Sequence, residues 1–176
     1  MLLPERIDTE RLTLRPPQLT DAAAIYTGYA GDPLATRYLT WKPHVDIAVT
    51  RDFLHGLAGE SRPDELVWAL CERARSEHVI GMLSLRPAGF KAELGYVLAP
   101  ALWGRGYMAE AVRAVVEHGL GAGLYRVAAF CDVENFQSAR VLEKAGMQRE
   151  GLLRRYALHP NLGNEPRDVF MFAACR

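Results

Sequence analysis

The chain has 176 residues, of which 49% are hydrophobic and 24% are charged, and this length suits a single domain with one sizeable core over residues 1–176. Lysine plus arginine balance aspartate plus glutamate, 21 against 21, so no global field draws in nucleic acid or an anionic membrane. The three cysteines, Cys71, Cys131 and Cys175, are few and widely spaced, which argues against a disulfide framework and a cysteine-based metal site.

Hydrophobic periodicity predicts the elements of the first half of the chain. Residues 11–15 alternate polar and apolar side chains, as a half-buried strand does. Thr20 and Asp21 then precede an Ala-rich helix to Tyr29, which Gly31, Asp32 and Pro33 end. The further elements are a helix over 46–57 that ends near Gly59, strands over 66–72, 79–86 and 92–98, and polar turns over 73–78 and 87–89.

The second half begins with the strongest helical pattern, over 106–120. A strand over 126–131 and a helix over 136–145, stopped by Gly146, follow it. Two late strands, over 147–158 and 169–175, are joined by the loop HPNLGNEP. A strand–helix–strand unit after an antiparallel meander predicts an α/β (mixed α+β) fold with a mixed sheet and helices on its faces.

Between the strand and the strong helix lies the segment ELGYVLAPALWGRGYMA, residues 93–109. Gly104 and Gly106 flank Arg105 and let the backbone approach a ligand closely. The helix start offers unpaired N–H groups and the positive end of the dipole, which suit phosphate oxygens, and Arg105 adds a charged donor. Spacing alone leaves a tight turn without a ligand equally open. The segment is neither a Walker loop nor a dinucleotide fingerprint.

The same segment resembles motif A of the GNAT superfamily, Gln/Arg-x-x-Gly-x-Gly/Ala. Trp103 takes the Gln/Arg position, Gly106 the invariant glycine and Met108 the last small residue. Trp103 and Met108 depart from that consensus, but Trp-Gly-x-Gly-Tyr is typical of the branch that resembles the ribosomal-protein alanine N-acetyltransferases RimJ and RimL. TERLTLRPPQLTDA at 9–22 and ENFQSARVLEKAGMQREGLLR at 134–154 resemble two further segments of that branch.

This resemblance implies the GNAT fold, whose mostly antiparallel sheet of about seven strands splays between the fourth and fifth. It also implies acetyl-CoA as cosubstrate, bound where those strands part. Pantetheine would pair with Val97 and Ala99, with Tyr96 and Leu98 alongside, and the Val97 N–H would polarise the thioester carbonyl. The pyrophosphate would lie on the N–H groups of Gly104, Arg105, Gly106, Tyr107, Met108 and Ala109. Asn135 would bind pantetheine, cap its helix, or do both.

The resemblance also suggests catalytic residues. Glu93 would act as the base, either directly or through water, and its alternative is an exposed carboxylate paired with Lys91 or an arginine. Ser138 would protonate the departing thiolate, and its alternative is a first-turn serine that caps its own backbone. Cys131 is expected to be a buried apolar residue rather than a nucleophile.

Relatives often carry a second carboxylate after Glu-Gly, but LLRRYALHP has no acid. That departure weakens a two-carboxylate mechanism and leaves Tyr156 or His159 as substitutes. Tyr38, Trp41 and Tyr156 are the candidate residues for binding the acceptor. The alternative for each of these aromatic side chains is a place in the hydrophobic core, without contact to the acceptor.

The sequence thus predicts an N-acetyltransferase that transfers acetyl from acetyl-CoA to a primary amine, such as a peptide N-terminal α-amine or a small amino compound. A catalytically silent acyl-CoA-binding module of the same fold is the main alternative, and an unrelated phosphate-binding enzyme is a third. MLLPERIDTERL lacks the apolar stretch of a signal peptide, and no run of about 18 apolar residues occurs. We expect a cytoplasmic protein without metal, nucleic-acid or membrane partners, and leave a homodimer open.

Overall fold

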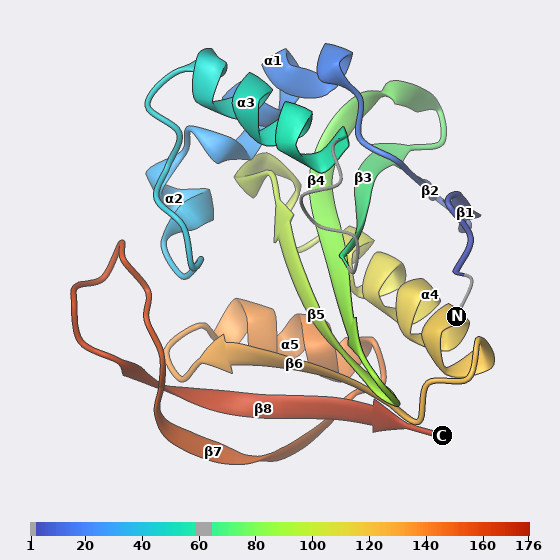
Figure 1. Ribbon diagram of the computed structural model, residues 1–176, viewed down its shortest axis with the longest axis vertical. Helices are drawn as coiled ribbons and strands as arrows, with labels where there is room; N and C mark the ends of the chain where they lie inside the picture. The colour runs from blue at the N-terminus through green and yellow to red at the C-terminus, as the bar shows by residue number, and fades with distance from the viewer. Residues whose placement is uncertain (1–2, 59–64) are drawn as a thin grey trace.

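The computed structural model describes residues 3–58 and 65–176, and one eight-stranded sheet organises them in the order β1-β2-β3-β4-β5-β6-β8-β7 (Figure 1). Neighbouring strands are antiparallel except β5 and β6, which are parallel. This confirms the predicted mixed, mostly antiparallel sheet. The strands are β1 (Ile7–Asp8), β2 (Leu12–Arg15), β3 (Leu66–Glu72), β4 (Arg75–Ala88), β5 (Lys91–Leu98), β6 (Arg126–Asp132), β7 (Gln148–Ala157) and β8 (Arg167–Cys175).

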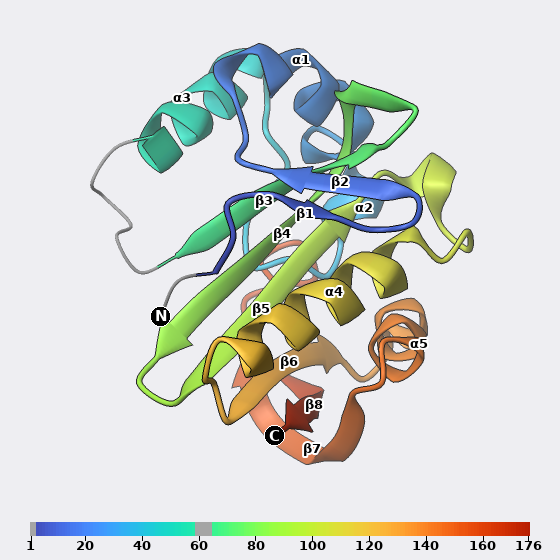
Figure 2. The same ribbon diagram turned by 90° about the vertical axis from the view of Figure 1, so that its right-hand side faces the viewer.

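Helices cover both faces of this sheet (Figure 2). Helices α4 and α5 pack on one face, and α1, α2 and α3 lie over the other. Within the described residues, none of the helices has the length and apolar character needed to cross a bilayer. The α-helices are α1 (Ala22–Ile25), α2 (Pro33–Thr36), α3 (Ile47–Ala58), α4 (Tyr107–Gly121) and α5 (Phe136–Lys144), with the 3₁₀ turns η1 (Leu19–Asp21) and η3 (Pro100–Leu102) and the π-helical turn η2 (Tyr26–Ala30).

Successive side chains of the central strands point to alternate faces of the sheet, and a hydrophobic core forms on each face. In β3, Leu70 packs in the cluster under α4, whereas its neighbour Ala69 packs in the cluster under α1 and α3. In β5, Leu98 belongs to the first cluster and Val97 borders the second. Because successive side chains of a strand point to opposite faces, each residue of β5 can be assigned to the α4 side or the α1 side.

Three predicted boundaries differ from the structure. The turn expected over 73–78 is shorter because β4 already begins at Arg75, which pairs with Glu72 of β3. β4 also continues through Ala88, so the next turn begins at Gly89, where φ is +64°. The helix expected up to Tyr29 consists of three short consecutive segments, the last of them π-helical. Gly59 lies outside the described residues.

The parallel strands β5 and β6 are joined only at their first residues. Their register is Lys91 with Arg126, Ala92 with Val127 and Glu93 with Ala128. Beyond Glu93 the two strands diverge, and Figure 1 shows them opening like a V from their shared start near the C-terminus. The predicted splay between these strands is therefore confirmed. Within residues 3–58 and 65–176, the second half of β5 has a strand partner only on the β4 side.

Candidate functional site

The splay exposes the backbone of alternate residues of β5. The Ala99 N–H donates to the Ile80 carbonyl at 2.9 Å, so Ala99 pairs towards β4. Val97 has the same parity, and a Cβ on Gly81 of β4 would lie 2.5 Å from its carbonyl oxygen. In a regular antiparallel ladder the residues between such pairs direct their N–H and C=O groups to the other side. Tyr96 and Leu98 therefore present their N–H groups to the splay.

This parity corrects the expectation for pantetheine. Val97 and Ala99 were expected to pair with it, and the N–H of Val97 to polarise the thioester carbonyl. Both residues instead bond to β4, so they have no N–H to offer towards β6. The strand register, which the amino-acid pattern does not reveal, decides the difference. The side chain of Val97 points to the α1 face, where it borders the second core cluster.

The loop after β5 is tied back to the strand by Trp103. Its indole Nε1–H donates to the Leu98 carbonyl at 2.9 Å. Gly104 and Gly106 follow with φ of +78° and +82°, a conformation that side chains with a Cβ rarely adopt. A Cβ built on Gly104 would meet nothing within 4 Å, so this side of the loop is open to a ligand.

The start of α4 completes a cradle of backbone N–H groups. Gly106 is the N-cap residue, and the Glu110 N–H is the first to bond back to it, at 3.1 Å. The N–H groups of Tyr107, Met108 and Ala109 thus precede the helical ladder and lack an intrahelical acceptor. The side chains of Met108 and Ala109 are buried in the core, so these two residues can offer only their backbone. Arg105 is exposed beside them. The arrangement fits an anionic diphosphate.

Ser138 and Asn135 lie at the start of α5, on the α4 side of the sheet. The Asn135 side chain accepts the Ser138 N–H at 3.1 Å, as a helix N-cap does. The Ser138 Oγ lies 2.6 Å from the Tyr96 hydroxyl. Burial of the adjacent Cys131 raises the pKa of its thiol to about 11, so the thiol is protonated and un-nucleophilic at neutral pH.

Glu93 lies on the opposite face from Ser138. It shares the face of Val97 and is the cross-strand partner of Arg86, whose Nη2 lies 3.9 Å from the Glu93 carboxylate. The carboxylate is 38% exposed, as expected for a strand-end acid. Val97 lies four positions after Glu93, roughly 13 Å along a strand. A carboxylate at that distance reaches the middle of the splay only through water.

The three residues predicted to bind the acceptor amine lie in two places, on the segment after α2 and on strand β7. Tyr38 and Trp41 follow α2, and the Asn161 side chain of the β7–β8 loop donates to the carbonyls of Thr36 and Trp41 at 2.7 and 2.8 Å. Tyr156 on β7 instead packs edge-on against Phe130 of β6, with ring centroids 5.4 Å apart. The β7–β8 loop therefore contacts Trp41 through Asn161 and Tyr38 through His159, whereas Tyr156 lies on the strands β6 and β7. Trp41 also borders the second core cluster.

Comparison with known proteins identifies the family. Residues 11–148 match the family model of the acetyltransferase (GNAT) domain. The chain belongs to the GNAT acetyltransferase family. The uncharacterised N-acetyltransferase p20 of Bacillus licheniformis is 31% identical over 173 residues, which cover 96% of this chain and 95% of p20.

Solved GNAT structures agree with this assignment. A GNAT-family acetyltransferase from Bacillus anthracis gives a TM-score of 0.81 at 26% identity and covers 97% of this chain and 98% of its own. RimJ of Mycobacterium smegmatis, solved in complex with CoA-disulfide, gives a TM-score of 0.76 at 26% identity, with 93% of this chain and 81% of RimJ covered. The family predicted from motif A is confirmed.

Two clusters of charged side chains in this GNAT domain were not predicted from the sequence. One joins Arg11 and Glu110 beside the loop of residues 104–106, called the glycine loop below. The guanidinium and the carboxylate lie 2.7 Å apart. The other surrounds the buried Asp132 at the end of β6, which accepts hydrogen bonds from Arg167 at 2.6 and 3.2 Å. Both clusters join residues that are far apart in the chain, so the local sequence pattern does not predict them.

His159 adjoins the second cluster and is only 2% exposed. Its Nε2 lies 3.7 Å from the Asp132 carboxylate, and its ring meets Tyr38 edge-on at 6.4 Å. Neither ring nitrogen makes a well-formed hydrogen bond within the described residues, although the backbone of Tyr38 and Leu39 lies close. Burial lowers the pKa of His159, against the opposing effect of Asp132. This neutral histidine packs the β7–β8 loop against the segment after α2.

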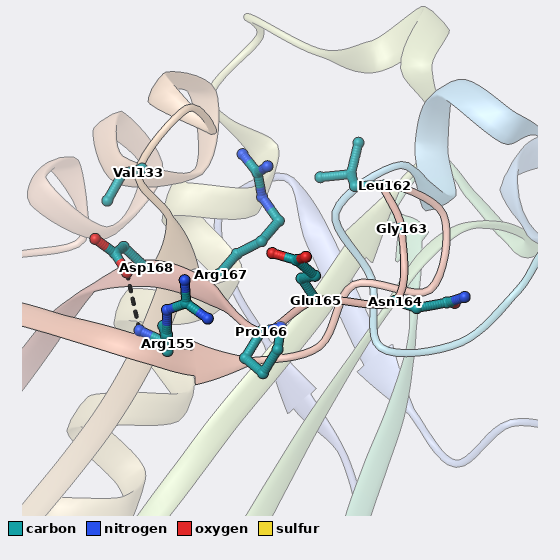
Figure 3. A pocket seen from close by; sticks show the side chains of 9 residues that line it. All are labelled: Val133, Arg155, Leu162, Gly163, Asn164, Glu165, Pro166, Arg167 and Asp168. Carbon is teal, nitrogen blue, oxygen red and sulfur yellow. Dashed lines mark hydrogen bonds between the residues drawn. The ribbon is translucent and has the colours of Figure 1, made fainter.

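A surface hollow of about 590 Å³ lies at the start of β8 (Figure 3). The side chains of Arg155, Arg167 and Glu165 surround it, and the Arg155 N–H donates to Asp168 Oδ1 at 2.8 Å. That bond supports a positive φ of 46° at Arg155. No residue of β5 or α4 lines the hollow, so it is distinct from the splay. Within the described residues, no group of three or more His, Cys, Asp or Glu side chains could hold a metal ion.

Proposed function

We propose that this protein is an acetyl-CoA-dependent N-acetyltransferase, built as one domain over residues 1–176, that acylates a primary amine. One observation carries the proposal. The N–H groups of Tyr96 and Leu98 face the splay, and the same segment leads directly to the Gly104–Gly106 loop and the unpaired N–H groups of α4. Pantetheine needs strand-like partners and its pyrophosphate needs N–H donors, and both occur here in that order. The complex of the related RimJ with CoA-disulfide supports this assignment.

The two faces of β5 separate the proposed proton transfers. The acceptor amine approaches from the α1 face and attacks the thioester carbon, while one of the two N–H groups that face the splay, that of Tyr96 or Leu98, stabilises the oxyanion and the other pairs with pantetheine. The amine proton leaves through water towards Glu93 on that face. The carbon–sulfur bond then breaks, and Ser138 on the α5 face supplies the proton that the thiolate takes up. Acid and base thereby act on opposite sides of the reacting carbon.

We infer that the acceptor is an α-amine, on a peptide N-terminus or a small amino compound. An α-amine has a pKa of about 8 against about 10.4 for lysine, so it needs less help to lose its proton. This matters because the proposed base acts at a distance. The loop HPNLGNEP contacts Trp41 through Asn161 and Tyr38 through His159, and it has proline and glycine but few charges. It resembles a wall more than an ionic clamp, and Tyr156 would supply the facing wall.

We also propose a cytoplasmic location, which the three free cysteines support because oxidising compartments favour disulfides. The enzymatic proposal is tested with acetyl-CoA and a panel of amines and peptides. We expect calorimetry to detect acetyl-CoA binding, and release of the CoA thiol to depend on the added amine. Binding without release for every acceptor would instead favour a silent acyl-CoA-binding module. Absence of binding would contradict both.

A further inference from the structure

The turn between β1 and β2 docks on the first turn of α4. The Thr9 hydroxyl donates to Glu110 Oε1 at 2.6 Å, and the Arg11 backbone N–H donates to the same oxygen at 2.9 Å. The Arg11 Nε donates to Glu110 Oε2 at 2.7 Å. Burial raises the pKa of Glu110, but these hydrogen bonds and the Arg11 charge outweigh that effect and lower the pKa overall. The carboxylate is therefore ionised and fully engaged.

The same arginine contacts the two residues that flank Gly106. Its Nη1 donates to the Arg105 carbonyl at 3.0 Å. Its guanidinium carbon lies 4.7 Å from the centroid of the Tyr107 ring. A Cβ on Gly106 would lie 3.4 Å from its Nη2. One side chain thus holds the carbonyl and the ring on either side of Gly106 and lies close to that glycine.

The position of the Glu110 carboxylate affects how an anion can bind to the start of α4. Glu110 lies in the first turn of α4, next to the N–H groups of Tyr107, Met108 and Ala109. An unpaired carboxylate there repels any phosphate that binds to those N–H groups. Arg11 neutralises it and directs the Arg105 carbonyl towards its own guanidinium. The N–H groups of the loop are then the polar groups left for an anion.

We propose that Arg11 is a positioning residue for the donor: it fixes the glycine loop and screens Glu110, so that the backbone N–H groups of 104–109 can receive the pyrophosphate of acetyl-CoA. The inference rests on the proposed function, because it concerns the same donor site. The proposal gives a role to the Thr-Glu-Arg-Leu segment at residues 9–12, which lies about a hundred residues before the glycine loop in the chain.

The test compares two donors that differ only beyond the pantetheine arm: acetyl-CoA and S-acetylpantetheine, which lacks the pyrophosphate and nucleotide. For Arg11→Ala we expect kcat/KM with acetyl-CoA to fall ~10-fold or more, mainly through KM, as for the loss of a charged hydrogen bond. With S-acetylpantetheine the same variant stays within about twofold of wild type, because the lost contacts serve only the phosphates. Calorimetry with CoA and pantetheine provides the same comparison without turnover.

Two further variants separate the contributions. Arg11→Lys keeps the charge but loses the planar fork, so we expect an intermediate loss and a folded protein even if the alanine variant is unstable. Glu110→Gln in the Arg11→Ala background removes the repulsion and recovers part of the CoA affinity. Equal losses with both donors, or unchanged CoA affinity in both Arg11 variants, would overturn the inference while leaving an active wild type intact. A wild type that binds no CoA would overturn the proposed function as well.

Discussion

The Tyr96 hydroxyl on β5 lies 2.6 Å from the Ser138 Oγ on α5, so a pair of hydroxyl groups bridges the α5 side of the splay. The Tyr96 hydroxyl also lies 3.2 Å from the Ser138 carbonyl. Burial raises the pKa of Tyr96, so it stays protonated and can donate its one proton either to the Ser138 carbonyl or to the Ser138 Oγ. When it donates to the Oγ, Ser138 keeps its own proton for a leaving thiolate.

Removing either hydroxyl tests this pair. We expect Ser138→Ala to lower kcat by roughly 10²-fold, as for the loss of a general acid. Tyr96→Phe leaves the serine in place but removes the hydroxyl that orients it, so we expect a smaller fall in kcat for this variant. Because the two groups act as a unit, the double variant should be no slower than Ser138→Ala. Single-turnover rates measure this, and multiplicative losses would show that the hydroxyls act independently.

Glu93 is expected to serve as a water-linked base on the other face. Glu93→Gln should lower kcat by roughly 10²-fold at neutral pH. The loss should shrink as the pH rises towards the amine pKa of about 8, because the amine then loses its proton to solvent. Arg86→Gln is the matched control, since it breaks the ion pair but keeps the carboxylate. A pH–rate profile for Glu93→Gln that parallels wild type would contradict the role.

The register of β5 makes a backbone prediction. Leu98→Pro removes an N–H that faces the splay and leaves the β4 ladder intact, which is where proline is tolerated in a sheet. We expect this variant to fold but to bind acetyl-CoA at least tenfold more weakly than Leu98→Ala, its control for lost packing. Val97→Pro removes an N–H bonded to β4 and should unfold the protein. Equal affinities of Leu98→Pro and Leu98→Ala would exclude a pantetheine bond at that position.

The buried cluster at the end of β6 predicts how stability depends on pH. The pKa of His159 is lowered by burial, so the unfolded state takes up the proton first, near its ordinary pKa of about 6.5. Its contribution to stability is present above that pH and is lost as pH falls towards the folded pKa. Burial of Asp132 raises its pKa, but the Arg167 bonds outweigh this and lower it, so its contribution disappears below about pH 4.

Urea unfolding between pH 5 and 8 measures the histidine effect. Wild-type stability should decline below about pH 6.5, and His159→Asn should decline less steeply. The pKa of His44 is also lowered by burial, so some slope should persist in that variant. Identical slopes in both proteins would show that His159 is protonated equally in the folded and unfolded states.

Much of this fold follows from local pattern. Leu70 and Ala69, or Leu98 and Val97, alternate between two cores because period-two hydrophobicity sets the faces of a strand. The glycine loop was visible because Gly104 and Gly106 immediately precede a strongly periodic helix.

Other features depend on pairings that local pattern cannot determine. Whether Val97 or Leu98 faces the splay is set by the register of β4 against β5. The contact of Arg11 with Glu110 spans 99 residues, and that of Asp132 with Arg167 spans 35. Composition and spacing along the chain carry no signal for such long-range partners.

We propose that this GNAT protein acetylates an α-amine, and a single peptide can distinguish this acceptor from a lysine side chain. The peptide carries a free N-terminus and one internal lysine and is incubated with the protein and acetyl-CoA, followed by fragmentation mass spectrometry. Our account predicts one acetyl group, located mainly on the N-terminal amine, and its loss when the N-terminus is blocked beforehand. Acetylation mainly on the lysine, or no acetylated peptide although acetyl-CoA binds and a small amine panel also stays unmodified, would contradict it.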